Sequence, residues 1–362
     1  MNAETVAEKV ASIAARGLSE GLFAGLSARM ERGGIPVFAE ALGNAIDANG
    51  MKTPMTTCTK FDIASLTKLF TTTAILRLAT EGRIGLDSAL CDIGWTANAA
   101  RGRTALENAF RGITVKKLLM HSSGLHYWYP FYAEKDRDFA DILELVLRRF
   151  PLEDGSVYSD LNFMILGKII EAVAGFPLEK AIEEIVCGPL GLGDSGYRPR
   201  SGPFAATEFG NRVEMKMVED LGLSFQSWRA IDRPIVGEPD DGNCHYYFGG
   251  AAGHAGIFST VADICTLGRL YLDPLGNEGY LEPALVAEAA SDHGGNRGLG
   301  FQLGELYPGG GFGHTGFTGT YLYLNRRLDL AVAVFANRLH VGNPRNINEF
   351  RKEIIGAAIG LP

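Results

Sequence analysis

The sequence lacks several features that would point to particular classes of protein. It has 34 Lys and Arg against 42 Asp and Glu, a net charge of −8, so it does not supply the clustered basic residues that nucleic-acid binding needs. Its five cysteines are an odd number without a Cys-x-x-Cys pair, which indicates neither a disulfide framework nor a zinc ribbon. Apolar runs such as residues 328–336 are far shorter than a bilayer span, and the first residues lack the apolar core of a signal peptide. We therefore expect a cytoplasmic protein with reduced thiols, no membrane span and no nucleic-acid partner.

The composition is that of a globular protein with a large core. The chain has 362 residues, of which 46% are apolar and 21% charged. At this length about three quarters of the surface of the unfolded chain is buried on folding, so neither disulfides nor structural metals are needed to hold the fold. A chain of this length also favours more than one lobe.

Both ends of the sequence predict strands and a helix that could belong to one sheet. Short apolar or alternating runs flank glycine-rich or polar turns and predict two β-hairpins, residues 23–31 with 35–43 and residues 320–325 with 329–337. Apolar residues at helical spacing predict a first helix over 3–20 and a terminal helix over 346–359.

The middle of the chain has a different pattern. Apolar residues recur at intervals of three and four, separated by Gly and Pro, in residues 114–120, 139–149, 161–174 and 178–187. The simplest interpretation is an α/β lobe formed by residues 1–85 and 248–362, with a mainly helical lobe of residues 86–247 inserted between its halves.

Ser65 and Lys68 are the most informative pair of residues. They begin a segment in which apolar residues recur at helical spacing and after which Gly82 can end a helix; the predicted buried stripe is Leu66, Leu69, Phe70, Thr73, Leu76 and Ala79. At a helix start, unpaired N–H groups favour negative charge on the serine oxygen, and a lysine three residues on lies on the same face. A desolvated lysine can take the serine proton. A helix-capping serine beside a solvent-facing lysine would give the same pattern.

Two further clusters accompany this pair. Tyr158-Ser159-Asp160 places a phenol and a carboxylate in a loop before a helical segment, although a helix cap with a packed tyrosine would look the same. His314-Thr315-Gly316-Phe317 precedes the run 320–325, and its glycine allows backbone N–H groups to approach a ligand closely. An ordinary glycine-rich turn is the alternative.

In this order, the three clusters resemble motifs of the active-site serine β-lactamase and penicillin-binding protein superfamily, specifically its class C-like branch of esterases and D-peptidases. Other segments that are similar to that branch are residues 113–125, 188–196, 249–260 and 336–338, so the resemblance covers about residues 20–360. It implies an α+β, β-lactamase/transpeptidase-like fold, an antiparallel sheet flanked by helices with an inserted all-helical lobe, and a site between the two parts.

The resemblance also implies the roles of the candidate residues. Ser65 would attack a carbonyl and form an acyl-enzyme, with Lys68 and Tyr158 sharing the proton transfers as a coupled pair. The backbone N–H groups of Ser65 and Phe317 would form the oxyanion hole, and Asp160, His314, Thr315 and Gly316 would belong to the substrate-binding edge.

Two departures from the family pattern bear on the substrate and on the base. His314 stands where the family has the lysine of Lys-Thr-Gly, and a largely neutral histidine does not supply a fixed cation for a substrate carboxylate, so strong β-lactam binding is not expected. Asp160 replaces the usual asparagine, and its charge would stabilise the ammonium of Lys68. This substitution favours Tyr158 as the principal base.

Other motifs are set aside on their context. Gly17-Leu-Ser19-Glu-Gly21 matches a nucleophile elbow but follows a helical run, and Gly193-Asp-Ser195-Gly196 resembles the trypsin-type serine signature outside a β-barrel. His121 and His126 lack a third ligand at metal spacing, so we interpret them as structural. The aromatic residues of segment 127–132 could line an acyl pocket or pack the helical lobe, and the sequence favours neither.

We therefore predict a serine hydrolase that cleaves an ester or amide, with a small ester, a D-amino-acid peptide or weakly a β-lactam as its small-molecule substrate. No metal or organic cofactor is implied, and the sequence does not indicate an oligomeric state. The alternative is a catalytically silent penicillin-binding-protein-like module that binds a peptide or scaffolds an assembly. Retention of a base beside a nucleophile argues against that alternative, because a pure binder needs no base.

Overall fold

Both ends of the chain contribute to one antiparallel sheet. The computed structural model describes residues 3–134, 136–275 and 279–360. The six-stranded sheet has the order β3 (Met51–Pro54), β2 (Ile35–Ala48), β1 (Gly25–Arg32), β9 (Leu330–Ala336), β8 (Thr320–Asn325) and β7 (Phe312–Thr315). All of its pairings are antiparallel, and β1 from the first hairpin lies beside β9 from the last. Both predicted hairpins are therefore confirmed.

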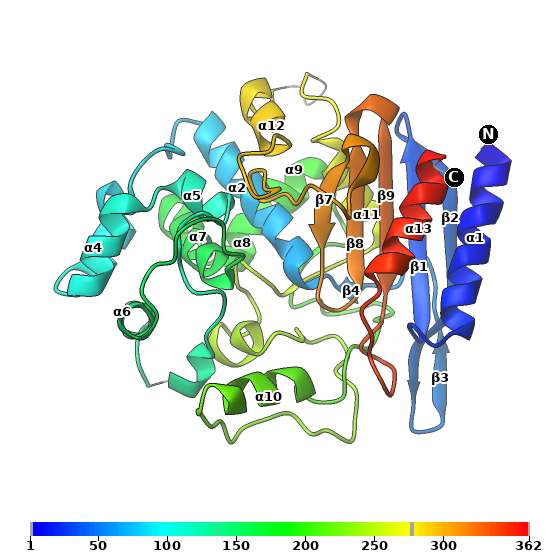
Figure 1. Ribbon diagram of the computed structural model, residues 1–362, viewed down its shortest axis with the longest axis horizontal. Helices are drawn as coiled ribbons and strands as arrows, with labels where there is room; N and C mark the ends of the chain where they lie inside the picture. The colour runs from blue at the N-terminus through cyan, green and yellow to red at the C-terminus, as the bar shows by residue number, and fades with distance from the viewer. Residues whose placement is uncertain (1–2, 135, 276–278, 361–362) are drawn as a thin grey trace.

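The two faces of the sheet are covered by different helices (Figure 1). Helices α1 (Ala3–Ser19) and α13 (Asn348–Ile359) pack on one face, and α2 (Thr67–Thr80) and α11 (Val261–Arg269) lie on the other. Residues alternate between these faces along each strand, because successive side chains of a strand point to opposite sides. Tyr321 and Tyr323 pack towards α1 and α13, whereas Leu322 and Leu324 pack towards α2 and α11.

Residues 86–247 contain most of the remaining helices, as the periodicity predicts. They are α3 (Gly94–Ala100), α4 (Thr104–Gly112), α5 (Val115–Leu119), α6 (Phe139–Arg149), α7 (Asp160–Ala174), α8 (Leu178–Ile182), α9 (Gly188–Leu190) and α10 (Arg212–Asp220). A second, three-stranded sheet joins β5 (Gly196–Tyr197) to β6 (Ile257–Ser259) and β4 (Phe61–Asp62), and α12 (Pro283–Ala289) precedes β7. The lobe boundaries at residues 86 and 247 stay a prediction.

Helix α2 lies in the interior between the sheet and the helices of the middle segment. Every residue from Thr67 to Leu76 is buried, so this part of the helix has no solvent face and the predicted single stripe underestimates its burial. Its polar residues have internal partners: the Thr71 hydroxyl donates to the Gly253 carbonyl at 2.7 Å, and the Thr73 hydroxyl contacts the Tyr271 hydroxyl at 2.7 Å. A helix buried on all sides holds the side chains on its first turn in fixed positions.

None of the helices described is by itself long and apolar enough to cross a membrane. Two consecutive helical segments of the described chain, residues 160–174 and 178–190, are long and apolar enough only when taken together, and they are bent by 77° relative to each other.

Candidate active site

Ser65 lies in a tight turn between strand β4 and helix α2. The turn is a short 3₁₀ helix, Ala64–Leu66, and Ala64 has a φ of +45°, which is unfavourable for a residue with a Cβ. A carboxylate of Asp62 stabilises the turn, because its Oδ1 accepts the Ala64 N–H at 2.8 Å and its Oδ2 accepts the Asp240 N–H at 2.7 Å. Burial raises the pKa of Asp62 to about 7. The sequence reasoning missed Asp62, although it lies only three residues before the serine.

Lys68 is fully buried and points at Ser65. Its Nζ donates to the Ser65 Oγ at 2.9 Å and to the His254 carbonyl at 3.2 Å, and it lies 2.8 Å from the Asp160 Oδ1. Burial lowers the pKa of Lys68, but Asp160 and Tyr158 outweigh this effect and raise it above the usual value. The lysine is therefore an ammonium at neutral pH, as the substitution of Asp160 for asparagine predicts.

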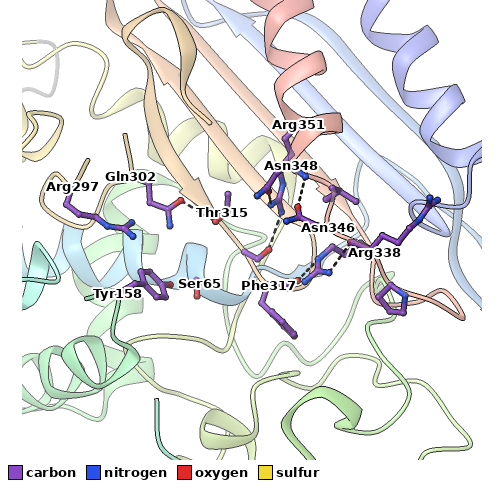
Figure 2. A pocket seen from close by; sticks show the side chains of 14 residues that line it. Ser65, Tyr158, Arg297, Gln302, Thr315, Phe317, Arg338, Asn346, Asn348 and Arg351 are labelled. Atoms are coloured by element: carbon purple, nitrogen blue, oxygen red, sulfur yellow. Dashed lines mark hydrogen bonds between the residues drawn. The ribbon is translucent and has the colours of Figure 1, made fainter. Parts of the chain in front are cut away.

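Tyr158 completes a cluster with these two residues. Its hydroxyl points towards Ser65 in Figure 2, and the Lys68 Nζ lies 5.0 Å from the centre of its ring. Burial raises the pKa of Tyr158, while Lys68 acts in the opposite direction. The phenol is therefore protonated at neutral pH in the resting protein.

His121 supports the loop that carries Tyr158. Its Nδ1 accepts the Ser159 N–H at 3.0 Å, and its ring centre lies 4.5 Å from that of Tyr158. Burial lowers the pKa of His121 well below its usual value, which keeps the ring neutral and able to accept. The sequence indicates a structural histidine, and the structure shows that its contact reaches the candidate site.

The end of β7 supplies a second backbone edge opposite Ser65. A Cβ on Gly316 would lie 2.0 Å from the Thr320 Oγ1 and 2.6 Å from the Ile63 carbonyl oxygen, so only glycine fits this close approach. In the described part of the chain, neither the Ser65 N–H nor the Phe317 N–H donates to a protein acceptor. These two free donors could bind an oxyanion.

A cavity of about 460 Å³ opens beside this cluster (Figure 2). Ser65, Tyr158 and the segment Thr315–Phe317 line it, together with several arginines. The Arg297 guanidinium lies 5.3 Å from the centre of the Tyr158 ring, and its buried Nε has no hydrogen-bond partner among the described residues. Gln302 beside it accepts from the Tyr307 hydroxyl at 2.9 Å and from the Thr315 hydroxyl at 3.2 Å, which leaves its amide nitrogen as a donor for the cavity.

Two of the residues expected at the substrate edge do not line the cavity. His314 is 1% exposed and its Nδ1 contacts the Thr315 carbonyl at 2.8 Å; burial and the charge of Lys68 lower its pKa well below the usual value. Asp160 pairs with Lys68. Neither residue is among those that line the cavity, and direct substrate binding by them stays a prediction.

The motifs that were set aside lie elsewhere. The Ser19 hydroxyl donates to the Arg16 carbonyl at the end of α1, and the Ser195 hydroxyl is bonded to Ser259 and Asp263. Of the aromatic residues of segment 127–132, only Tyr127 is exposed and none lines the cavity, which is the arrangement of a packed lobe rather than an acyl pocket. Within residues 3–134, 136–275 and 279–360, no three His, Cys, Asp or Glu side chains are grouped so that they could hold a metal ion.

Known proteins resemble this chain over nearly its whole length. A family model described as Beta-lactamase matches residues 5–355. A protein of Escherichia coli (strain K12) named "Putative D-alanyl-D-alanine carboxypeptidase" is 30% identical over 357 residues, which cover 87% of this chain and 79% of that protein.

Solved structures share the fold at low sequence identity. The structure of EstCE1, described as a hydrolase with promiscuous acyltransferase activity, superposes with a TM-score of 0.74 at 21% identity and 98% coverage of both chains. A class C beta lactamase from Rhodobacter sphaeroides gives a TM-score of 0.69 at 18% identity, with 97% of this chain and 99% of that chain covered. These likenesses establish a β-lactamase/transpeptidase-like fold for the chain.

Proposed function

Because the chain belongs to the beta-lactamase family and is a serine hydrolase of that family, we propose that Ser65 is its nucleophile and that it cleaves an ester or amide through an acyl-enzyme. One observation carries this proposal. Ser65, Lys68 and Tyr158 meet at one point, with the Lys68 Nζ 2.9 Å from the Ser65 Oγ, beside two unoccupied backbone donors. A nucleophile, a proton acceptor and an oxyanion site within one cavity are the parts that acyl transfer requires.

The proton chemistry follows from the charges of the cluster. The raised pKa values of Lys68 and Tyr158 mean that both groups hold their protons at neutral pH. Loss of one proton from this coupled pair creates the acceptor for the Ser65 proton, and the ammonium of Lys68 favours placing the resulting negative charge on Tyr158. We therefore propose Tyr158 as the principal base, with Lys68 holding its phenolate. Activity then rises with pH as the pair loses this proton.

The remaining steps use the backbone and water. As Ser65 Oγ attacks, the substrate carbonyl oxygen becomes an oxyanion between the N–H groups of Ser65 and Phe317, and the protonated pair returns its proton to the leaving group. Water then attacks the acyl-enzyme in the same geometry and gives one proton to the pair, and the pair passes this proton to Ser65 Oγ as the bond between Oγ and the acyl carbon breaks. The products are a carboxylic acid and the alcohol or amine, and Ser65 is restored.

We further propose that the substrate has a carboxylate near the scissile bond. Arg297 supports this, because its partly buried cation lies over Tyr158 in the cavity wall and no carboxylate is seen to pair with it in the described residues. The donor amide of Gln302 lies on the same wall. Arg297 thus takes the place of the cation that His314 does not provide. A peptide ending in a D-amino acid has such a carboxylate, and this class agrees with the name of the Escherichia coli relative.

Covalent labelling of Ser65 tests the proposal. A fluorophosphonate probe is expected to label the wild-type protein and Ser19→Ala equally but to leave Ser65→Ala unlabelled, because Ser65 contacts Lys68 in the cavity whereas the Ser19 hydroxyl donates to a backbone carbonyl. A chromogenic short-chain ester and a D-alanyl dipeptide report turnover in parallel. Folded wild-type protein that is neither labelled nor active would overturn the proposal and favour the silent binding module. Labelling that persists in Ser65→Ala would assign the nucleophile to another residue.

A further inference from the structure

Arg351 of helix α13 is a buried cation whose partners are all neutral. Arg351 is 5% exposed, and among the described residues no carboxylate forms an ion pair with its guanidinium. Its Nη1 donates to the Asn348 Oδ1 at 2.9 Å, and its Nη2 is shared between the carbonyls of Gly316 at 3.3 Å and Thr320 at 3.0 Å. Its Nε is buried without a partner.

Such an arrangement is unfavourable for stability alone. A charged group removed from water without a counter-ion costs several kcal/mol, and an apolar side chain of similar length would avoid that cost. Burial lowers the pKa of Arg351 to about 10, so the guanidinium keeps its charge at neutral pH. Helix α13 thus places an uncompensated positive charge in the cavity wall, next to the backbone edge of the site.

The two carbonyls that Arg351 binds control the backbone edge of the site. The carbonyl and the N–H of a trans peptide point in opposite directions, so fixing the Gly316 carbonyl also fixes the direction of the Phe317 N–H. The Gly319 N–H donates to the same carbonyl at 3.1 Å, and the Arg338 Nε donates to the next one, that of Phe317, at 2.9 Å. In Figure 2 both arginines lie on the side of this segment away from Tyr158 and Ser65.

Resting on the proposed function, we propose that Arg351 is a positioning residue for the oxyanion hole. It holds the Gly316–Phe317 peptide with its N–H directed at the substrate, and its charge polarises that N–H through the carbonyl of the same peptide. When the substrate oxygen becomes negative, the positive charge behind the peptide is no longer uncompensated. The interaction is therefore stronger in the transition state than in the substrate complex, which is the condition for raising kcat.

Steady-state kinetics of Arg351→Met and Arg351→Lys with a chromogenic ester test the proposal. Removing an oxyanion donor outright costs about 100- to 1000-fold in rate, so losing the group behind it is expected to lower kcat by about 10- to 100-fold. KM should change by less than about threefold, because the substrate carbonyl carries no full charge in the ground state. Arg351→Lys keeps the charge and is expected to recover most of kcat.

Arg326→Met is the matched control. Arg326 is a partly buried arginine that, like Arg351, binds two carbonyls, those of Tyr271 at 2.9 Å and Val286 at 2.6 Å, but it lies at the β8–β9 turn away from the cavity. The Arg326→Met variant is expected to lower the melting temperature, as Arg351→Met does, and to leave kcat unchanged. A kcat of Arg351→Met within threefold of the wild-type value would overturn this inference and leave the proposed function standing. A kcat of Arg351→Lys no higher than that of Arg351→Met would have the same meaning. A wild type without Ser65-dependent turnover overturns the proposed function and this inference with it.

Discussion

Replacing Asp160 by asparagine removes one negative charge beside the catalytic cluster and keeps the shape of the side chain. The Asp160 Oδ1 lies 2.8 Å from the Lys68 Nζ, and Asp160 raises the pKa of both Lys68 and Tyr158. Without this charge, deprotonation of the pair no longer places a second negative charge next to a carboxylate. Asp160→Asn should therefore move the rising limb of the pH profile of kcat/KM to lower pH.

The size of the shift can be bounded from the distance. At an effective dielectric constant of about 20, two unit charges 2.8 Å apart attract with about 6 kcal/mol. Part of this gain offsets the cost of keeping Lys68 out of water, and measured effects of one opposite charge are about 1–3 pKa units. We therefore expect the limb to move down by about 1–3 pH units. Because the wild-type pair keeps its protons at neutral pH, the variant is expected to be the more active form per molecule at pH 7.

The measurement is kcat/KM for a chromogenic ester between about pH 5 and pH 10, with a neutral substrate so that Arg297 does not contribute. Asp160→Glu, which keeps the charge, serves as the control and should retain the wild-type limb. A limb that stays in place in Asp160→Asn, or that moves to higher pH, would show that the Asp160 charge does not set the proton affinity of the acceptor. The assignment of the Lys68–Tyr158 pair as that acceptor would then be wrong.

Two further predictions concern the cavity wall. Gly316→Ala places a Cβ 2.0 Å from the Thr320 Oγ1, so the end of β7 must move; fluorophosphonate labelling of Ser65 is expected to slow by at least about 100-fold, and thermal unfolding should show a loss of about 1–3 kcal/mol. Labelling at the wild-type rate would show that this edge is not part of the oxyanion hole. Arg297→Gln is expected to raise KM for a D-alanyl dipeptide by about 10- to 100-fold while a neutral ester is unaffected. Equal losses for both substrates would place the carboxylate elsewhere.

The hairpins and most helices could be predicted because their patterns are local. The apolar pattern of residues 320–325 and the helical spacing of apolar residues in 139–149 each involve residues close together in the sequence. The structure has β8 and α6 at those positions. Helix α2 shows the limit of this reasoning. Its predicted stripe is buried except at Ala79, which is partly buried, but Lys68, Thr71 and Thr72 on its other faces are buried as well, since helices distant in sequence cover them. The spacing of apolar residues predicts which side of a helix faces the core, but it does not show that a helix is surrounded by core on every side.

The supporting residues of the site could not be found in the same way. His121, Arg297 and Arg351 reach it from three distant segments, and each uses a contact that no spacing encodes: a backbone N–H, a ring face and a pair of carbonyls. The φ of +45° at Ala64 is also invisible in the sequence, because alanine is not a residue that favours this conformation. The motif residues could be recognised because the proposed chemistry requires particular residue types at those positions. The residues that support them can be identified only from their contacts in the folded structure.

The pairing of β1 with β9 has a consequence for how the molecule is made. Strand β1 has left the ribosome long before its neighbour at residues 330–336 is synthesised, so one of its edges waits unpaired during most of translation. Contacts between residues so far apart in sequence slow folding. Until they form, hydrophobic surface stays exposed, which favours binding of the nascent chain by chaperones. Helices α1 and α13 lie side by side at the finished sheet (Figure 1), so a permuted gene that joins them by a short linker would let both hairpins emerge together.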